Sequence, residues 1–453
     1  MKENLDRQTE RLKNYAINNG YEIVEITKEI ASGMNDNRKK INKHMQLVEK
    51  HIIKNGHSLY DECDSLCFLS KNLYNSILYN IRQHYFNNKT YLSLSDSYKL
   101  IKESVDYKQL PAKVGNQTLR LVDKNFKSFF SLLKKKNSGG YNEKVKIPRY
   151  LDKVKGRFIT KYEKGALSVK EFKKTGRIKL SKTNINISTG VKDFETINEV
   201  RIIPRNLYYV IEVVYTVPDV KLKENNGKYC AIDLGVNNLA TMTFNTGDTP
   251  EIINGKPLKS INQYYNKKTS EYKSKLENVN KKHTSKRLSK LSFKRNNKVN
   301  DYLHKASKLV VNQLVSKGVN TLVIGQNKEW KQDINNGRKN NQNFVQIPHH
   351  KFIRMLEYKC KLVGINVILQ EESYTSKASF LSQDFIPTYG KGDKGEHKFS
   401  GYRIHRGLYK EKGDRIYINA DVNGSYNILR KAIPNAFVNG IEGLSVNPLI
   451  INV

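Results

Sequence analysis

Cysteine, acidic residues and long apolar runs are all scarce in this sequence. Four cysteines in 453 residues are too few for a disulfide framework. No uncharged apolar run reaches the roughly 18 residues that a membrane-spanning helix needs, and the N-terminus lacks the apolar stretch of a secretory signal peptide. These absences exclude a disulfide-stabilised secreted domain and a membrane protein. We therefore expect a reduced, soluble protein of the cytoplasm.

The shortage of acid leaves the chain strongly basic. Its 80 Lys and Arg outnumber 43 Asp and Glu, so the net charge at pH 7 is +37. A folded chain of this charge repels itself unless it binds a polyanion, and nucleic acid is the partner that we expect. The 27 Tyr and 16 Phe suit base stacking, although a solvated basic surface is the alternative interpretation of the lysines. No Walker loop, dinucleotide-binding glycine motif or nucleophile elbow is present, so a nucleotide-driven motor is not supported.

The first half of the chain shows a β pattern that helices interrupt. Its alternating segments are typical of strands, and its longest helical segment repeats apolar residues at three- and four-residue spacing. The predicted elements are a strand at 45–54, helices at 61–86, 95–104 and 113–135, and several strands between 145 and 225. The simplest arrangement is a β module that carries a helical insertion.

From Gly227 onward, strands and helices alternate, which is typical of an α/β sheet. The predicted elements are two strands within 228–244, a Lys-rich helical pair within 262–317, a buried strand at 320–325, a helix that begins at Pro348, a strand at 365–372 and a last helix that begins near residue 421. Asp233 ends the first of these strands, and Asp421 lies at the start of the last helix.

Carboxylates at element ends in such a sheet are typical of a ribonuclease-H-like site. Two Mg²⁺ ions about 4 Å apart stabilise the attacking and leaving oxygens of a phosphodiester displacement, and they need converging carboxylates as ligands. A strand-end aspartate is also a common turn or helix cap. From spacing alone, Asp233 is as well explained by a cap as by a metal site.

Three motifs decide between these interpretations. AIDLGVNNLAT (231–241) resembles the first RuvC motif of TnpB proteins, the transposon-encoded RNA-guided nucleases related to miniature type V CRISPR effectors. NADVNGSYNILRKA (419–432) resembles their third motif, and ESYTSKAS (372–379) resembles the start of their zinc-ribbon insertion. The resemblance implies that Asp233 and Asp421 bind Mg²⁺, and that the partners are a guide RNA from the same element and a double-stranded DNA target with a short adjacent motif.

The second motif departs from that family, because its strand ends in Gly325 where a glutamate is usual. Glu329, the nearest acid after Gly325, lies beyond the end of the strand and is interpreted as a surface residue. Glu371 and Glu372 end the next strand, which lies beside the first in a ribonuclease-H-like sheet, so either carboxylate could reach the same metal. Strand alternation allows only one of them to face it, and Glu371 is slightly favoured because it is nearer the body of the strand. The alternatives are that both are exposed acids and that the protein is a nuclease-inactive, RNA-guided DNA-binding repressor.

The zinc-ribbon insertion of the family departs as well. TnpB insertions commonly carry two CxxC pairs, but the cysteines of this chain are Cys63, Cys67, Cys230 and Cys360, all outside residues 374–417. We therefore expect a degenerate insertion without structural zinc. Cys63 and Cys67, four residues apart on a predicted helix, are interpreted as core thiols.

The N-terminal segment resembles a second family. Residues 7–40, which end in NDNRKK, resemble the middle of the catalytic domain of TnpA-type serine recombinases, and Arg38 corresponds to the arginine that supports their attacking serine. That serine and the family's long helix have no counterpart here, so we interpret residues 1–43 as a remnant without recombinase activity. A third hypothesis follows, in which the chain is a transposition accessory factor that docks onto a serine recombinase.

The leading hypothesis is a Mg²⁺-dependent, RNA-guided DNA endonuclease of a bacterial transposable element, associated with the nucleoid. Its fold is α/β plus β: a ribonuclease-H-like (RuvC) nuclease and a β-barrel-like wedge module with a helical insertion. The expected parts are a recombinase-like remnant (1–43), the first wedge strand (44–60), a helical recognition insertion (61–140), the other wedge strands (141–226), the nuclease (227–373), the degenerate zinc-ribbon-like insertion (374–417) and the end of the nuclease (418–453).

Overall fold

A computed structural model describes the chain from residue 45 onward, with interruptions. The described residues are 45–281, 283–326, 346–389, 397–405, 407–413, 416–438, 440–441 and 443–453. The chain divides into two compact units, Met1–Asp219 and Val220–Val453. The predicted recombinase-like remnant lies outside the described residues. No helix among the described residues is long and apolar enough to cross a membrane.

The first unit is built on an antiparallel sheet with the strand order β1-β6-β5-β2. These strands are β1 (Met45–Lys54), β6 (Tyr208–Val217), β5 (Ile197–Arg205) and β2 (Thr160–Glu163). The long alternating β6 pairs along its whole length with β1, from Met45 opposite Val217 to Lys54 opposite Tyr208. In the part of the chain that the structure describes, β1 and β2 form the two edges of this sheet. The predicted barrel-like closure is therefore not confirmed.

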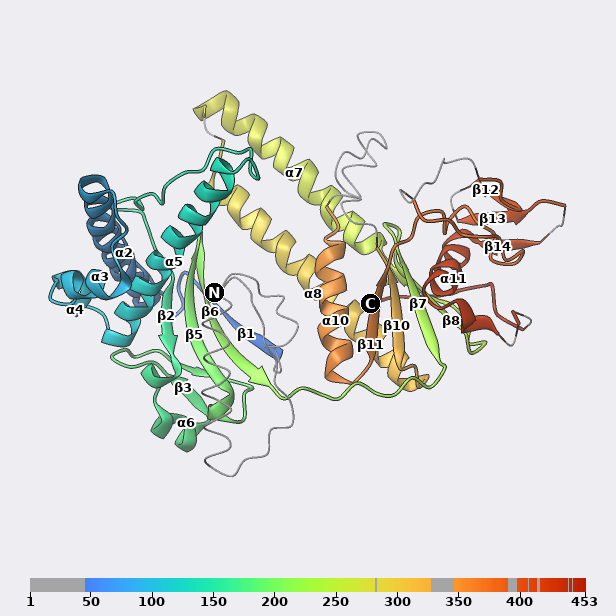
Figure 1. Ribbon diagram of the computed structural model, residues 1–453, viewed down its shortest axis with the longest axis horizontal. Helices are drawn as coiled ribbons and strands as arrows, with labels where there is room; N and C mark the ends of the chain where they lie inside the picture. The colour runs from blue at the N-terminus through green and yellow to red at the C-terminus, as the bar shows by residue number, and fades with distance from the viewer. Residues whose placement is uncertain are drawn as a thin grey trace. The chain divides into compact units, whose positions relative to one another are not determined.

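Helices occupy the chain between β1 and β2, as the apolar spacing predicts (Figure 1). They are α2 (Tyr60–Asn88), α3 (Leu94–Ile101), α4 (Val105–Lys108) and α5 (Ala112–Asn137). α2 buries its apolar face in the same core as the sheet, and Ser70 of α2 shares a 2.8 Å hydrogen bond with Thr160 of β2. Cys63 and Cys67 lie fully buried in this core, as predicted, and burial raises the pKa of each thiol to about 12.

Smaller elements complete the first unit between β2 and β5. They are the 3₁₀ turns η1 (Lys164–Ala166) and η2 (Phe194–Thr196), the helix α6 (Val169–Thr175) and the two-stranded sheet of β3 (Arg177–Lys179) and β4 (Asn186–Ser188). Ser168 caps α6 by accepting a hydrogen bond from the backbone N–H of Glu171, and Gly176 ends it in the left-handed conformation that glycine adopts without strain.

The second unit contains a six-stranded mixed sheet with the order β11-β10-β7-β8-β9-β15. Its strands are β11 (Asn366–Gln370), β10 (Thr321–Gly325), β7 (Tyr229–Leu234), β8 (Asn238–Phe244), β9 (Glu251–Asn254) and β15 (Leu449–Ile451). β7, β8 and β9 are antiparallel neighbours, whereas β10 runs parallel to both β7 and β11. The strand that precedes both candidate glutamates is therefore next to the strand that ends in Gly325, as predicted.

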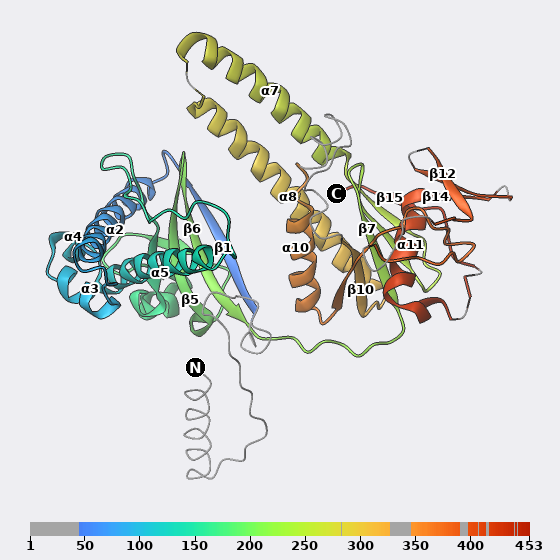
Figure 2. The same cartoon turned by 45° about the horizontal axis from the view of Figure 1, so that its top comes forward.

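Helices cover both faces of this sheet (Figures 1 and 2). They are the basic pair α7 (Lys256–Asn280) and α8 (Lys286–Ser316), followed by α10 (His349–Leu362) and α11 (Ala420–Ala432). Because side chains of a strand alternate between faces, Cys230 and Ile232 of β7 face the core with α8 and α10. Ala231 of β7 packs instead with α11. Asp233 therefore lies on the α11 side of the sheet.

A small three-stranded sheet and a long loop stand against α11. The strands are β12 (Gly401–His405), β13 (Leu408–Glu411) and β14 (Tyr417–Asn419), and the 3₁₀ turn η3 (Pro434–Phe437) follows α11. Phe380 of the loop stacks on Tyr426 of α11 with ring centroids 4.4 Å apart, and the buried ring of Tyr409 belongs to the same cluster. This packing holds the loop around Phe380 and the strand β13 beside α11, which carries Asp421 in its first turn.

Candidate active site

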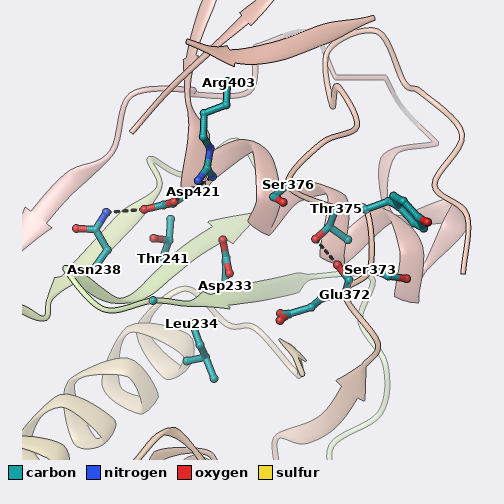
Figure 3. Close-up of a pocket in the computed structure, with 12 residues that line it drawn as sticks. Asp233, Leu234, Asn238, Thr241, Glu372, Ser373, Thr375, Ser376, Arg403 and Asp421 are labelled. Atoms are coloured by element: carbon teal, nitrogen blue, oxygen red, sulfur yellow. Dashed lines mark hydrogen bonds and ion pairs between the residues drawn. The ribbon is translucent and has the colours of Figure 1, made fainter. Parts of the chain in front are cut away.

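A pocket of about 350 Å³ opens where the carboxyl end of β7 meets the first turn of α11 (Figure 3). It is mostly polar, and it takes residues from four separate parts of the second unit. The lining residues are Asp233, Leu234, Gly235, Asn238, Thr241, Glu372, Ser373, Tyr374, Thr375, Ser376, Arg403 and Asp421. Three of the four carboxylates singled out from the sequence are thus brought together, and Glu371 is not.

Asp233 lies at the floor of this pocket, one residue before β7 ends. Burial raises the pKa of its carboxyl well above the ordinary value, the neighbouring Glu372 and Asp421 raise it further, and Arg403 acts in the opposite direction. The carboxylate lies so close to α11 that a Cβ added at Gly424 would be 2.9 Å from Asp233 Oδ2. A glycine at this helical position therefore makes room for the acid.

Asp421 begins α11, where the sequence predicts it. The side chain of Asn419 caps the helix by accepting hydrogen bonds from the backbone N–H groups of Asp421 (3.0 Å) and Val422 (3.2 Å). Asp421 is not itself the cap, so its carboxylate is left to face the pocket. There Asn238 donates to its Oδ2 at 2.7 Å, and the guanidinium of Arg403 lies 3.6 Å from its Oδ1.

Glu372 takes the place that a side chain at the end of β10 would occupy. A Cβ added at Gly325 would be 2.5 Å from Glu372 Oε2 and 2.5 Å from Cδ1 of Ile428. Both distances are shorter than real Cβ atoms tolerate, so the carboxylate of Glu372 and a side chain at position 325 exclude each other. Burial, and then the neighbouring Glu371, raise the pKa of Glu372 to about 7, against the lowering effect of Lys431.

Glu371 points to a different set of partners. Its Oε2 accepts from Lys431 Nζ at 2.7 Å, and its Oε1 accepts from the backbone N–H of Ser373 at 2.6 Å. The pocket is therefore lined by Glu372 and not by Glu371, the residue that the sequence slightly favours. That preference rested on Glu371 being nearer the body of the strand, but β11 ends at Gln370, so neither glutamate belongs to the paired strand. Glu329, the other acid considered, lies outside the described residues.

The loop that forms one wall of the pocket is fastened to α11 by two buried asparagines. Asn423 accepts from the backbone N–H of Phe380 at 2.9 Å and donates to the carbonyl of Ala378 at 2.8 Å. Asn427, one turn later, donates to the carbonyls of Thr375 and Ala378. The motif NADVNGSYN thus has two roles. It supplies the carboxylate of Asp421, and the side-chain amides of Asn423 and Asn427 hold the 375–380 loop in place.

Asn238 and Arg403 were not singled out from the sequence. Asn238 belongs to the quoted AIDLGVNNLAT segment, and its place at the start of β8, opposite the end of β7, is the signal that could have drawn attention to it. The sequence gives a weaker signal for Arg403, because the chain is rich in basic residues and an arginine in the alternating segment GYRIH does not stand out among them. Only the pairing of β12 with β13, a strand that contacts α11, brings it to Asp421, toward which its side chain points in Figure 3.

The residues of the pocket fit divalent cations by their chemistry. Carboxylate oxygens are the ligands that Mg²⁺ prefers, and the raised pKa values of Asp233 and Glu372 are the expected cost of gathering acids in a buried place without a cation. Among the described residues, however, no three His, Cys, Asp or Glu side chains are grouped closely enough to hold a metal ion. Asn238 and Arg403 compete for the oxygens of Asp421.

The raised pKa of Glu372 makes the stability of the metal-free protein depend on pH. The folded carboxyl has a pKa of about 7, whereas the unfolded chain exposes it with an ordinary pKa near ~4.3. Between these values the folded state keeps a proton that the unfolded state has lost, so the free energy of unfolding falls as the pH rises. We expect Glu372→Gln, which does not ionise, to match the parent at about pH 4 and to exceed it by on the order of 2 kcal/mol at about pH 8.

Thermal unfolding of the two proteins at both pH values, with and without Mg²⁺, measures this difference. Mg²⁺ should stabilise the parent more than the variant at the higher pH, because the variant lacks the Glu372 carboxylate. A variant less stable than the parent at both pH values would show that burial does not destabilise the Glu372 carboxylate.

Three family models match separate parts of the chain. OrfB_IS605, described as a probable transposase, matches residues 212–331, and the model described as Cas12f1-like, TNB domain, matches residues 349–428. The resolvase N-terminal domain matches residues 1–55. No curated protein matches the chain.

Solved structures of CRISPR effectors are distantly similar. A Cas12f1 in complex with sgRNA and target DNA has a TM-score of 0.48 at 14% identity, over 82% of each chain. A CRISPR-Cas12f ternary complex has a TM-score of 0.33 at 16% identity, over 81% of each chain. C2c1 of Alicyclobacillus acidoterrestris with single-guide RNA has a TM-score of 0.36 at 9% identity, over 83% of this chain and 70% of the other. These likenesses are too distant to carry an argument about function.

The family models confirm both resemblances that the motifs indicate. The probable-transposase match contains the AIDLGVNNLAT motif, the TNB match contains Asp421, and the resolvase match contains Arg38. Residues 212–331 and 349–428 are therefore similar to the probable-transposase and Cas12f1-like TNB families, and residues 1–55 are similar to a resolvase N-terminal domain.

Proposed function

We propose that the chain is an RNA-guided DNA endonuclease with a RuvC-like site formed by Asp233, Glu372 and Asp421. One observation carries the proposal: the Glu372 carboxylate fills the side-chain space of Gly325, the position where TnpB relatives usually have their glutamate. A carboxylate is thus present at the end of β10, although it is supplied from the neighbouring β11 side. The Glu372 carboxylate would therefore replace the glutamate that is missing at position 325.

The topology of the second unit supports a ribonuclease-H-like sheet. Three antiparallel strands are followed by two parallel ones, with the first aspartate at the end of the central β7 and the last on the helix that crosses it. The carboxyl ends of β7, β10 and β11 lie at one edge, because these three strands run parallel. In this proposal residues 44–60 and 141–226 are the wedge module, and residues 61–140 are its helical recognition insertion.

The protein's own residues would prepare the pocket for phosphodiester hydrolysis. Asp233, Glu372 and Asp421 would hold Mg²⁺, which supplies water activation and charge neutralisation when bound. Asp233 and Glu372 would release their protons on binding. Asn238 holds one oxygen of Asp421 and so limits the directions in which that carboxylate can turn. Arg403 could exchange its 3.6 Å contact with Asp421 for a phosphate oxygen of the substrate.

The charge of the chain supports RNA and DNA as partners. α7 and α8 together carry fourteen Lys and Arg against three Asp and Glu. Two of the arginines lie over tyrosine rings, Arg287 at 4.4 Å from the ring centroid of Tyr272 and Arg295 at 5.7 Å from that of Tyr265. These basic helices would contact the backbone of a guide RNA paired with its DNA target, while base pairing supplies the sequence specificity.

A nuclease-inactive repressor is the second candidate function. It is favoured by Asp421, whose two oxygens are taken by Asn238 and Arg403, and by the lack of a grouped three-residue metal site among the described residues. An accessory factor for a serine recombinase rests on residues 1–43, which the structure does not describe. Cleavage by the purified protein with its own RNA separates the first candidate from both others.

The ligand set can be tested by single substitutions. We expect Asp233→Ala, Glu372→Ala and Asp421→Ala each to lower the cleavage rate by more than the roughly 10–100-fold that outer-shell partners cost, because each removes a ligand. Glu357→Ala, which removes an acid of α10 outside the pocket, is the matched control and should cut at the parental rate. Target binding in a gel shift should survive in all four. Parental cleavage by Glu372→Ala would eliminate the compensating glutamate.

The exclusion between Glu372 and position 325 gives a second test. A methyl group at Gly325 would also meet Ile428, so the comparison is made in an Ile428→Ala background, where that clash is absent. Adding Gly325→Ala to Ile428→Ala should lower the rate by at least about 10-fold, because the methyl displaces the Glu372 carboxylate. Equal rates for the single and double variants would contradict the shared space.

The charge of the protein predicts its behaviour in salt. Without guide RNA, the chain should bind nucleic acid non-specifically and lose affinity by orders of magnitude between about 50 and 200 mM salt, because each phosphate contact releases counterions. Fluorescence anisotropy with a labelled single strand measures the slope. A flat response would mean that the basic side chains do not contact phosphates.

A further inference from the structure

Lys431 is almost completely buried at the last turn of α11, with 7% of its side chain exposed. Its ammonium donates to Glu371 Oε2 at 2.7 Å, to the carbonyl of Ser373 at 2.9 Å and to its Oγ at 3.3 Å, and to the carbonyl of Pro387 at 2.9 Å. A buried ammonium is costly unless all its protons find acceptors. Here the acceptors come from two separate stretches of chain, so the lysine fastens both to α11.

The residues that Lys431 binds are the immediate neighbours of Glu372 on both sides. Glu371 precedes it and Ser373 follows it, and these two are also joined by the hydrogen bond from the Ser373 N–H to Glu371 Oε1. Thr375 closes the turn with hydrogen bonds from its N–H and its hydroxyl to the carbonyl of Glu372. The backbone of Glu372 is thus held from both ends.

Glu372 needs such a clamp because it lies beyond its strand. β11 is an edge strand of the described sheet, and its pairing with β10 stops at Gly325 opposite Gln370. A glutamate at the end of β10 would be held by strands on both sides, whereas Glu372 is two residues past the ladder. The backbone of a turn has more freedom than that of a paired strand, and a metal ligand must be placed to within a fraction of an ångström.

We propose that Lys431 is the positioning residue of the compensating glutamate: by binding Glu371 and Ser373, it holds the Glu372 carboxylate over Gly325 and toward Asp233. α11 then sets two ligands at once, Asp421 through its first turn and Glu372 through its last. This inference rests on the proposed function of the pocket, and it assigns no contact between Lys431 and the substrate or the metal.

The test compares Lys431→Met, which keeps the length of the side chain but has no donor, with Lys431→Arg, which keeps the charge. Mn²⁺ binding to the protein without nucleic acid is measured by the signal of free Mn²⁺ in electron paramagnetic resonance, and DNA cleavage is measured with the protein's own RNA. We expect Lys431→Met to weaken Mn²⁺ binding and to slow cleavage by about 10–100-fold each. Lys431→Arg should recover part of both, and gel-shift binding of the target should not change.

Two further variants distinguish a loss of positioning from a loss of folding. Arg354→Met removes an exposed cation that pairs with Glu357 on α10, 3.5 Å away, and is the matched control, which should bind Mn²⁺ and cut like the parent. Glu371→Gln removes the charge partner of Lys431 without emptying its buried site, so it should reproduce the weaker Mn²⁺ binding in a folded protein. Circular dichroism verifies folding of each variant.

The outcomes separate this inference from the proposed function. If the parent never cuts, the endonuclease proposal fails, and Mn²⁺ binding alone then decides the role of Lys431. Parental Mn²⁺ binding by folded Lys431→Met or by Glu371→Gln overturns the inference. So does a parent that binds no Mn²⁺, because no ligand would then be positioned.

Discussion

The close contact between α11 and β7 is the constraint on which the rest of the site depends. Gly424 leaves space for the Asp233 carboxylate. The buried hydroxyl of Ser425 lies 2.9 Å from the hydroxyl of Thr243 and 3.1 Å from the carbonyl oxygens of Ala231 and Thr241, either of which can accept its single proton. These small side chains let the helix lie directly on the strands. A side chain at position 424 would meet the Asp233 carboxylate, so either this acid or α11 would have to move.

The close contact between α11 and β7 also brings carboxyl groups together, which raises the free energy of their ionised forms. Carboxyls brought together in a buried place repel one another when ionised, which is why Asp233 and Glu372 both have raised pKa values. The protein offsets part of this cost with cations at the rim and behind it, Arg403 beside Asp421 and Lys431 beside Glu371. A divalent cation would remove the remainder, so the arrangement favours metal binding and proton release together.

Much of the fold and part of the site were predictable because they rest on local patterns. Helical spacing identified α2, α5, α8 and α10, and alternation identified β1 and β6. The positions of Asp233 and Asp421 at the end of an apolar strand and the start of a helix are visible in the sequence, but only the resemblance to TnpB motifs favours them as metal ligands over caps. The barrel-like closure of the first unit was not confirmed, since sheet closure depends on which edges meet, and alternation does not encode that. Asn238 and Arg403 were missed because their partner, Asp421, is far away in the chain.

The sequence by itself determined the order of the elements, the large positive charge, the two aspartates and the absence of a glutamate at Gly325. It could not decide between Glu371 and Glu372, because two adjacent acids differ only in where the chain turns after a strand. Only the tertiary structure distinguishes their positions: β11 ends at Gln370, the Glu372 carboxylate lies beside Gly325 in the pocket, and Glu371 binds Lys431. Each of these is a contact between residues at least 45 positions apart or the end of a pairing ladder, and only packing defines them.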